Sequence, residues 1–90
     1  MIEMKCIVHG KVQGVRFRDY VQHSAGELGI FGWVKNDKKG TVIICAQGSP
    51  DILKEFVEYL HEGSVLSEVT GVEVEWGNVS ETYNDFSVLH

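Results

Sequence analysis

The sequence has 90 residues, 43% of them hydrophobic, and a formal net charge of −5 at pH 7. Residues 1–90 suffice for a single small domain with its own core, and the acidic total excludes a general nucleic-acid binder, which needs a broad basic surface. The N-terminus lacks a signal-peptide pattern and no apolar run approaches the roughly 20 residues that cross a membrane, so we expect a soluble, cytoplasmic protein.

The first half of the chain predicts a strand, a helix and a hairpin. Residues 4–9 are apolar and β-branched, which is typical of a short strand. A helix follows and ends near Gly29, because apolar residues recur on one face: Phe17, Val21, Ala25 and Leu28. Residues 30–36 and 40–48 are two strand-like runs joined by a hairpin turn.

The second half predicts another helix and two strands. Ser49 is suited to cap a helix that has Pro50 at its first position and stops at Gly63. Its apolar stripe is Ile52, Leu53, Phe56, Val57 and Leu60. Residues 72–76 alternate between apolar side chains and glutamates, as in a half-buried strand. The short piece with Phe86 and Val88 can extend the sheet or pair at its edge.

This order of elements predicts a ferredoxin-like α+β fold. The fold is a βαββαβ sandwich with an antiparallel sheet, two helices on one face and, here, a short terminal strand. A right-handed crossover makes the first two strands parallel, with the third strand between them. Their carboxyl ends then lie at the same edge, so residues 10–16 and Asn36 should face each other across about 10 Å, two strand spacings.

The cysteines and histidines carry no metal or redox motif. Alternation assigns Cys6 and Cys45 to opposite faces of the sheet, so we expect that they are not bonded to each other. The four histidines lack the spacing of metal ligands and have no paired cysteine or carboxylate motif. We therefore predict no metal site.

Residues 9–20, HGKVQGVRFRDY, gather cations and glycines where a strand gives way to a helix. A turn with Gly10 and Gly14 can aim successive backbone N–H groups at one anion, and the helix start adds its own donors. Arg16 and Arg18 are disfavoured at this end of a helix unless an anion joins them. The spacing alone leaves a second interpretation open, in which the glycines only shape the turn and the arginines extend into water.

At this point the sequence resembles the acylphosphatase family. GKVQGVRFR, residues 10–18, is similar to the family signature Gly-x-Val-Gln-Gly-Val-x-Phe/Tyr-Arg. GWVKN, residues 32–36, is similar to its second signature, together with Gly40, Val42 and Gly48. The resemblance covers the whole chain, but residues 63–65 are Gly-Ser-Val where the family often has Gly-Pro.

The resemblance implies hydrolysis of acyl phosphates to a carboxylate and inorganic phosphate, without a metal or organic cofactor. It assigns the phosphoryl group to Arg18 and to the backbone N–H groups of the loop, which belong to Gln13, Gly14, Val15, Arg16, Phe17 and Arg18. It also implies that the Asn36 amide orients the attacking water. Helical periodicity does not distinguish Arg16 from Arg18, and the motif match selects Arg18. The expected partner is a small-molecule acyl phosphate, with no nucleic acid and no membrane, and we expect a monomer.

A second function from another class fits the same fold. The chain could be a non-catalytic phosphoanion-binding or regulatory module that dimerises through a sheet edge. Asn36 distinguishes the two hypotheses, because a simple binder needs no water-orienting amide opposite its arginine.

Overall fold

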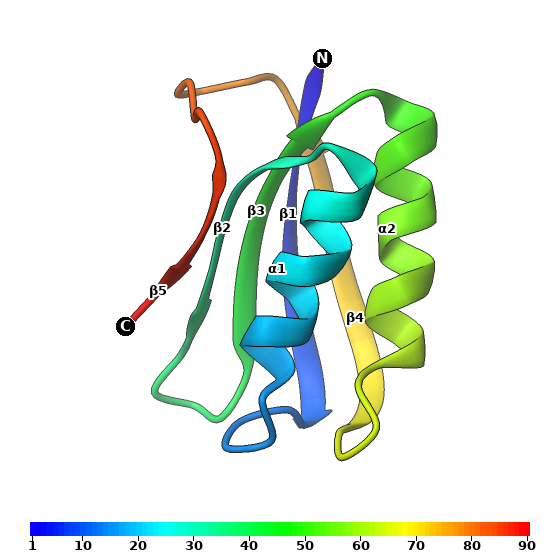
Figure 1. The fold of residues 1–90 in the computed structure, drawn as a ribbon, viewed down its shortest axis with the longest axis vertical. Helices are drawn as coiled ribbons and strands as arrows, with labels where there is room; N and C mark the ends of the chain where they lie inside the picture. The colour runs from blue at the N-terminus through cyan, green and yellow to red at the C-terminus, as the bar shows by residue number, and fades with distance from the viewer.

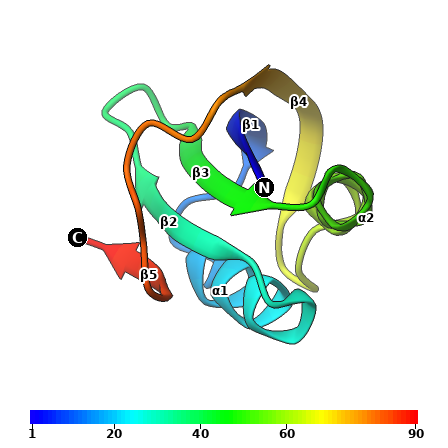
Figure 2. The same cartoon turned by 90° about the horizontal axis from the view of Figure 1, so that it is seen from above.

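The computed structural model describes residues 1–90 and consists of two helices on a five-stranded sheet (Figure 1). In chain order the elements are β1 (Ile2–Lys11), α1 (Phe17–Leu28), β2 (Phe31–Asn36), β3 (Val42–Gly48), α2 (Pro50–Glu62), β4 (Glu68–Gly77) and β5 (Phe86–Leu89). The strands lie in the order β4-β1-β3-β2-β5. Both helices cover the same face of the sheet, as Figure 2 shows. The predicted ferredoxin-like α+β fold is confirmed.

The terminal strand is the departure from an antiparallel sheet. The pairs β1–β3, β1–β4 and β2–β3 are antiparallel, whereas β5 runs parallel to β2. β4 and β5 lie at opposite edges, so the chain between them must pass the full width of the sheet (Figure 2). The connection leaves β4 and enters β5 at the same end of the sheet (Figure 1), so β5 runs antiparallel to β4 and parallel to β2. β5 pairs with β2 at the edge of the sheet.

Local sequence signals account for the bounds of both helices. α1 ends at Gly29, which has a φ of 70°, and α2 begins with Pro50 in its first turn and ends before Gly63. Pro suits the first turn because its missing N–H has no intrahelical partner there. Ser49 lies at the N-cap position with an extended backbone, but its side chain does not make the capping hydrogen bond that its residue type suggested. Neither helix is long and apolar enough to cross a membrane.

The core lies between the sheet and the helices. Alternate residues of β1 and β3 are fully buried on this inner face: Met4, Cys6, Val8, Val42, Ile44 and Ala46. They meet the buried stripes of α1 and α2, which include Phe17 and Phe56. Each such side chain contributes about 1.5–3 kcal/mol when it is removed from water. β4 contains no fully buried residue, because it is an edge strand.

The two cysteines are not bonded to each other, as predicted, and both are buried. Cys6 pairs with Ile44 across the sheet and Cys45 pairs with Lys5, so the thiols belong to opposite faces. Burial raises the pKa of Cys6 to about 12. Burial, with the negative charge of Glu3, raises the pKa of Cys45 to about 11. Both thiols therefore stay protonated and unreactive near neutral pH.

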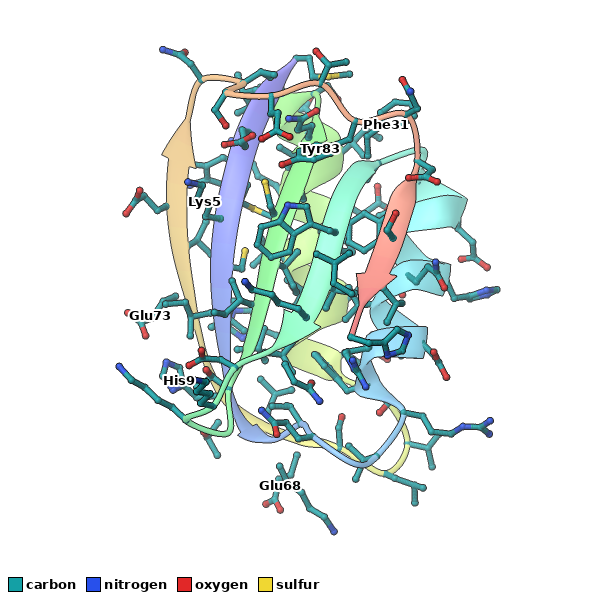
Figure 3. The ribbon with its side chains drawn as sticks, turned by 90° about the vertical axis from the view of Figure 1, so that its left-hand side faces the viewer. Lys5, His9, Phe31, Glu68, Glu73 and Tyr83 are labelled. Atoms are coloured by element: carbon teal, nitrogen blue, oxygen red, sulfur yellow. The ribbon has the colours of Figure 1, made fainter.

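Polar contacts hold residues 78–85, the connection between β4 and β5, against the outer face. The buried Glu3 carboxylate accepts hydrogen bonds from Gln47 Nε2 at 3.0 Å and from Ser80 Oγ at 3.1 Å. Trp33 Nε1 donates to the Tyr83 hydroxyl at 3.1 Å. Figure 3 shows Tyr83 on this connection. These contacts guide the chain to the edge where β5 pairs.

Gly10 belongs to β1 and not to the loop, which corrects the sequence prediction. The register between β1 and β4 shifts after His9, so Gly10 lies at a bulge with a φ of 124°. A Cβ atom on Gly10 would lie 2.0 Å from the Glu68 carbonyl oxygen. Glycine is needed here for the close approach of two strands, and the loop proper contains residues 12–16.

Candidate active site

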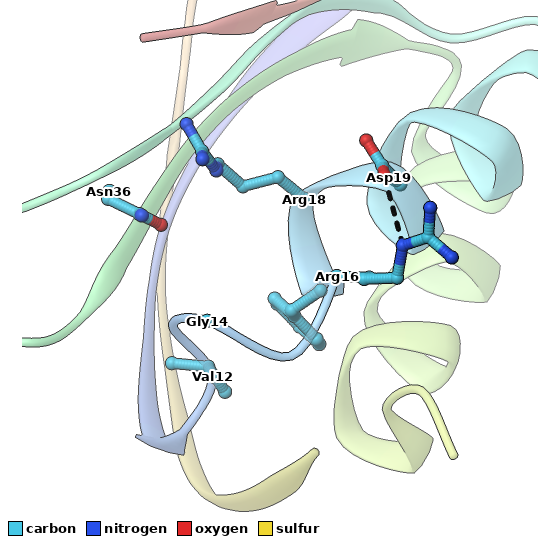
Figure 4. A pocket seen from close by; sticks show the side chains of 7 residues that line it. Val12, Gly14, Arg16, Arg18, Asp19 and Asn36 are labelled. Carbon is cyan, nitrogen blue, oxygen red and sulfur yellow. Dashed lines mark ion pairs between the residues drawn. The ribbon is translucent and has the colours of Figure 1, made fainter. Parts of the chain in front are cut away.

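The loop after β1, the start of α1 and the end of β2 border a cavity of about 300 Å³. Both strands are antiparallel to β3, which lies between them, so their carboxyl ends point the same way. Asn36 shares the inner face of β2 with the buried Val34, so its position faces the loop and α1. The cavity is lined by Val12, Gly14, Arg16, Phe17, Arg18, Asp19 and Asn36 (Figure 4).

The loop backbone alternates between left-handed and ordinary conformations. Gly14 has a φ of 71° and Arg16 a φ of 60°, while Val15 between them has no positive φ. Arg16 is the one non-glycine residue with a positive φ, a conformation that costs about 1–2 kcal/mol. Alternation of this kind turns successive N–H groups toward a common concave side, which is an anion-binding arrangement.

The N–H groups of this segment are free of internal partners. No backbone carbonyl accepts a hydrogen bond from the N–H groups of residues 13–18, and no side chain caps α1. The first such bond is from Tyr20 N to Arg16 O, at 3.2 Å. The first turn of a helix carries a partial positive charge, so these donors favour a negative ligand.

Four of the predicted phosphate-binding residues line the cavity and two do not. Gly14, Arg16, Phe17 and Arg18 line it, although the Phe17 side chain is buried in the core, so Phe17 presents only its backbone. The Val15 side chain is also buried in the core. Gln13 directs its side chain to the β2–β3 hairpin, where Nε2 donates to Asp37 O at 2.7 Å and Thr41 O at 2.8 Å.

The two arginines have different partners. Arg18 extends across the cavity toward the side where Asn36 lies (Figure 4), and its Nη1 donates to Leu89 O at 2.9 Å. His90 Nδ1 lies 3.5 Å from the same nitrogen. Arg16 points the other way, with Nε 4.0 Å from Asp19 Oδ2, and is 87% exposed. The β5 backbone thus orients one guanidinium, while the other extends into solvent.

Comparison with known proteins identifies the family. A model of the acylphosphatase family matches residues 4–88. An acylphosphatase of Dehalococcoides mccartyi is 43% identical over 88 residues, covering 97% of each chain. The crystal structure of acylphosphatase from Bacillus subtilis superposes with a TM-score of 0.96 at 40% identity and full coverage of both chains. The acylphosphatase of Coxiella burnetii has a TM-score of 0.91 at 41% identity, covering 98% of this chain and 92% of the other.

The chain belongs to the acylphosphatase family. The two motifs that resemble the family signatures are the two segments that border the cavity, because the first includes the loop and the second ends at Asn36. In this acylphosphatase the cavity combines unpaired N–H donors, a guanidinium and a neutral amide, all of which are groups that can bind an anion.

Sequence reasoning missed three residues of this candidate site. Asp19 lines the cavity and faces Arg16. Asp19 follows Arg16 by three residues, and opposite charges at that spacing on a helix often pair, so the sequence could have indicated this contact. Leu89 and His90 reach Arg18 only because β5 pairs beside β2, and no local signal predicts that placement.

The histidines otherwise lie outside the cavity. His9 Nε2 lies 2.5 Å from Glu73 Oε2 on the outer face, where Figure 3 shows the two side chains together. His23 pairs with Glu27 at 3.0 Å within α1. These pairs occupy surface positions.

Proposed function

We propose that this acylphosphatase hydrolyses acyl phosphates with the phosphoryl group held by Arg18 and by the N–H groups of residues 13–18, and with the attacking water oriented by Asn36. The observation that carries the proposal is the set of N–H donors without internal acceptors, beside a cavity that Arg18 and Asn36 also line. A dianion would satisfy those donors and the guanidinium together.

The reaction requires that water and the phosphoryl group be positioned and that charge on the phosphoryl oxygens be stabilised. Water forms a bond to phosphorus while the bond from phosphorus to the acyl oxygen breaks, and the electron pair leaves on the carboxylate. One proton of the water ends on a phosphate oxygen, so R–CO–OPO₃²⁻ and water become R–COO⁻ and H₂PO₄⁻. Charge in the loose transition state is spread over the phosphoryl oxygens, where Arg18 and the N–H groups act.

Asn36 suits the remaining task. Its carbonyl oxygen can accept a hydrogen bond from water and its NH₂ group can donate, so the amide can hold water without repelling a dianion. A carboxylate at this position would carry a repelling charge. A carboxylate product leaves readily, so the reaction needs no general acid.

We also propose that the enzyme acts as a cytoplasmic monomer without a metal. Arg18 and the loop supply positive charge at the cavity, so the proposed reaction has a source of charge stabilisation besides a metal. Two free buried cysteines are consistent with a reducing compartment. Sedimentation of the active enzyme as a 10.1 kDa species would support the monomer.

Hydrolysis of benzoyl phosphate in the presence of EDTA tests the proposal. Benzoate and inorganic phosphate should be released together, with inorganic phosphate as a competitive inhibitor. Asn36→Ala should lower kcat by about 10²-fold while changing the inhibition constant of phosphate far less, because the amide positions water and not the ligand. Unchanged kcat with weakened phosphate binding would contradict the role of Asn36, and loss of wild-type activity in EDTA would contradict metal independence.

A further inference from the structure

We propose that the Gln13 side chain is a positioning device that sets the spacing between the phosphate-binding loop and Asn36. The inference rests on the proposed function, because it concerns the two halves of that site. The backbone of Gln13 belongs to the phosphate-binding loop, and the new role concerns its side-chain amide alone.

The Gln13 amide is held between two carbonyls at the base of the β2–β3 turn. Its Nε2 donates to Asp37 O at 2.7 Å and to Thr41 O at 2.8 Å. Those two residues are bonded to each other, with Asp37 N donating to Thr41 O at 2.9 Å. An NH₂ group has two donors, so both are used, one on each side of the turn.

The side chains of loop residues 12–16 make two hydrogen bonds in all, and both are those of Gln13. β1 and β2 do not touch, because β3 lies between them. The N–H groups of residues 13–16 donate to no backbone carbonyl, and the one backbone hydrogen bond of the loop, from Tyr20 N to Arg16 O, lies at its far end beside α1. The Gln13 side chain therefore joins the loop directly to the turn between β2 and β3.

The anchor point is next to the water-orienting residue. Asp37 follows Asn36 in the chain, and Asn36 is the last residue of β2. The phosphoryl group is bound on the loop and α1, while the water is bound on β2. Attack requires the water oxygen at a defined distance from phosphorus, and a shift of about 1 Å can cost about 10²-fold in rate.

The Gln13→Met variant tests the role, because methionine has a similar length and no N–H donors. We expect kcat on benzoyl phosphate to fall about tenfold or more, while the inhibition constant of inorganic phosphate changes less than about threefold. Gln22→Met is the matched control: Gln22 Nε2 donates to Phe86 O at 3.0 Å, away from Asn36. This control should change neither constant by more than about twofold.

A double-mutant cycle separates positioning from general stability. If Gln13 acts through Asn36, adding Gln13→Met to Asn36→Ala should lower kcat by less than about twofold further. A fully additive loss would overturn the inference, as would equal losses of kcat and phosphate affinity in the single variant. Wild-type kcat in Gln13→Met would overturn it as well.

Gln13→Asn provides a second variant if Gln13→Met does not fold. It keeps the amide on a stem shorter by one carbon, so it cannot reach both carbonyls, and we expect the same selective loss of kcat. Failure of this inference is distinct from failure of the proposed function. In the first case Gln13 variants keep full activity while Asn36→Ala is impaired, and in the second case Asn36→Ala itself is fully active.

Discussion

At the scale of single residues, Arg18 and Arg16 differ in what surrounds their guanidinium groups. Arg18 is tied to the β5 backbone by a 2.9 Å hydrogen bond, which leaves its other nitrogens for the cavity. Arg16 reaches only the exposed Asp19, and an exposed ion pair contributes about 0–1 kcal/mol. The orientation of Arg18 fits the motif match that selected it over Arg16.

Arg18→Lys should keep the positive charge and lose most of the rate. Lysine lacks the planar fork that matches two phosphate oxygens and cannot also bond Leu89 O in the same way. We expect kcat/KM for benzoyl phosphate to fall by about 10²-fold or more, by analogy with the removal of a transition-state donor. Arg16→Ala is the control and should cost far less. Comparable activity in Arg18→Lys would contradict the assignment.

At the scale of elements, a bulge between β1 and β4 lies just before the loop. The register shifts between His9 and Gly10, the pairing with β4 continues to Lys11 opposite Glu68, and Gly10 permits the close approach to Glu68. Gly14 also has a positive φ, but a Cβ atom there would meet nothing within 4 Å. The two glycines therefore serve different purposes, strand packing and loop conformation.

Gly10→Ala should destabilise the fold more than Gly14→Ala. The added methyl group in Gly10→Ala overlaps a carbonyl oxygen, so β1 or β4 must shift, and we expect a loss of about 2 kcal/mol or more. Gly14→Ala meets open space and should lose about 1–2 kcal/mol from its left-handed backbone. Urea unfolding monitored by circular dichroism measures both. Equal losses would show that the bulge tolerates a side chain.

The connection between β4 and β5 should make stability depend on pH through Glu3. The hydrogen bond from Gln47 lowers the pKa of Glu3 below its ordinary value of 4.5, with help from Ser80 and against the effect of burial. Because the pKa of Glu3 is lower in the folded protein, the unfolded chain takes up the proton at a higher pH than the folded protein does as the pH falls. The stabilisation from Glu3 is therefore present above pH 4.5 and is lost as the pH falls through the lowered pKa. Glu3→Gln should weaken that pH dependence of the free energy of unfolding, and the exposed Glu75→Gln should not. If the free energy of unfolding depended on pH in the same way in wild type and in Glu3→Gln, this role of Glu3 would be contradicted.

At the scale of the whole molecule, ligand binding should stabilise the fold. The proposed phosphate site joins β1, α1 and β2, so phosphate binds only when these elements are assembled. A ligand that binds only the native state adds about 2.7 kcal/mol at 100 times its dissociation constant. Inorganic phosphate should therefore raise the Tm of the wild type well above that in potassium chloride of equal ionic strength. The rise should be smaller in Arg18→Lys, and an equal rise would count against the site.

The sequence alone determined the order of elements and the bounds of the second helix. These depend on local constraints: the fixed φ of Pro50, the helix stop at Gly63 and the spacing of apolar side chains. Tertiary structure decided the rest. The role of Gly10, the parallel pairing of β5, the Arg18–Leu89 bond and the Gln13 bridge each join residues far apart in the chain. Such contacts depend on which strand edges meet, and no local pattern encodes that choice.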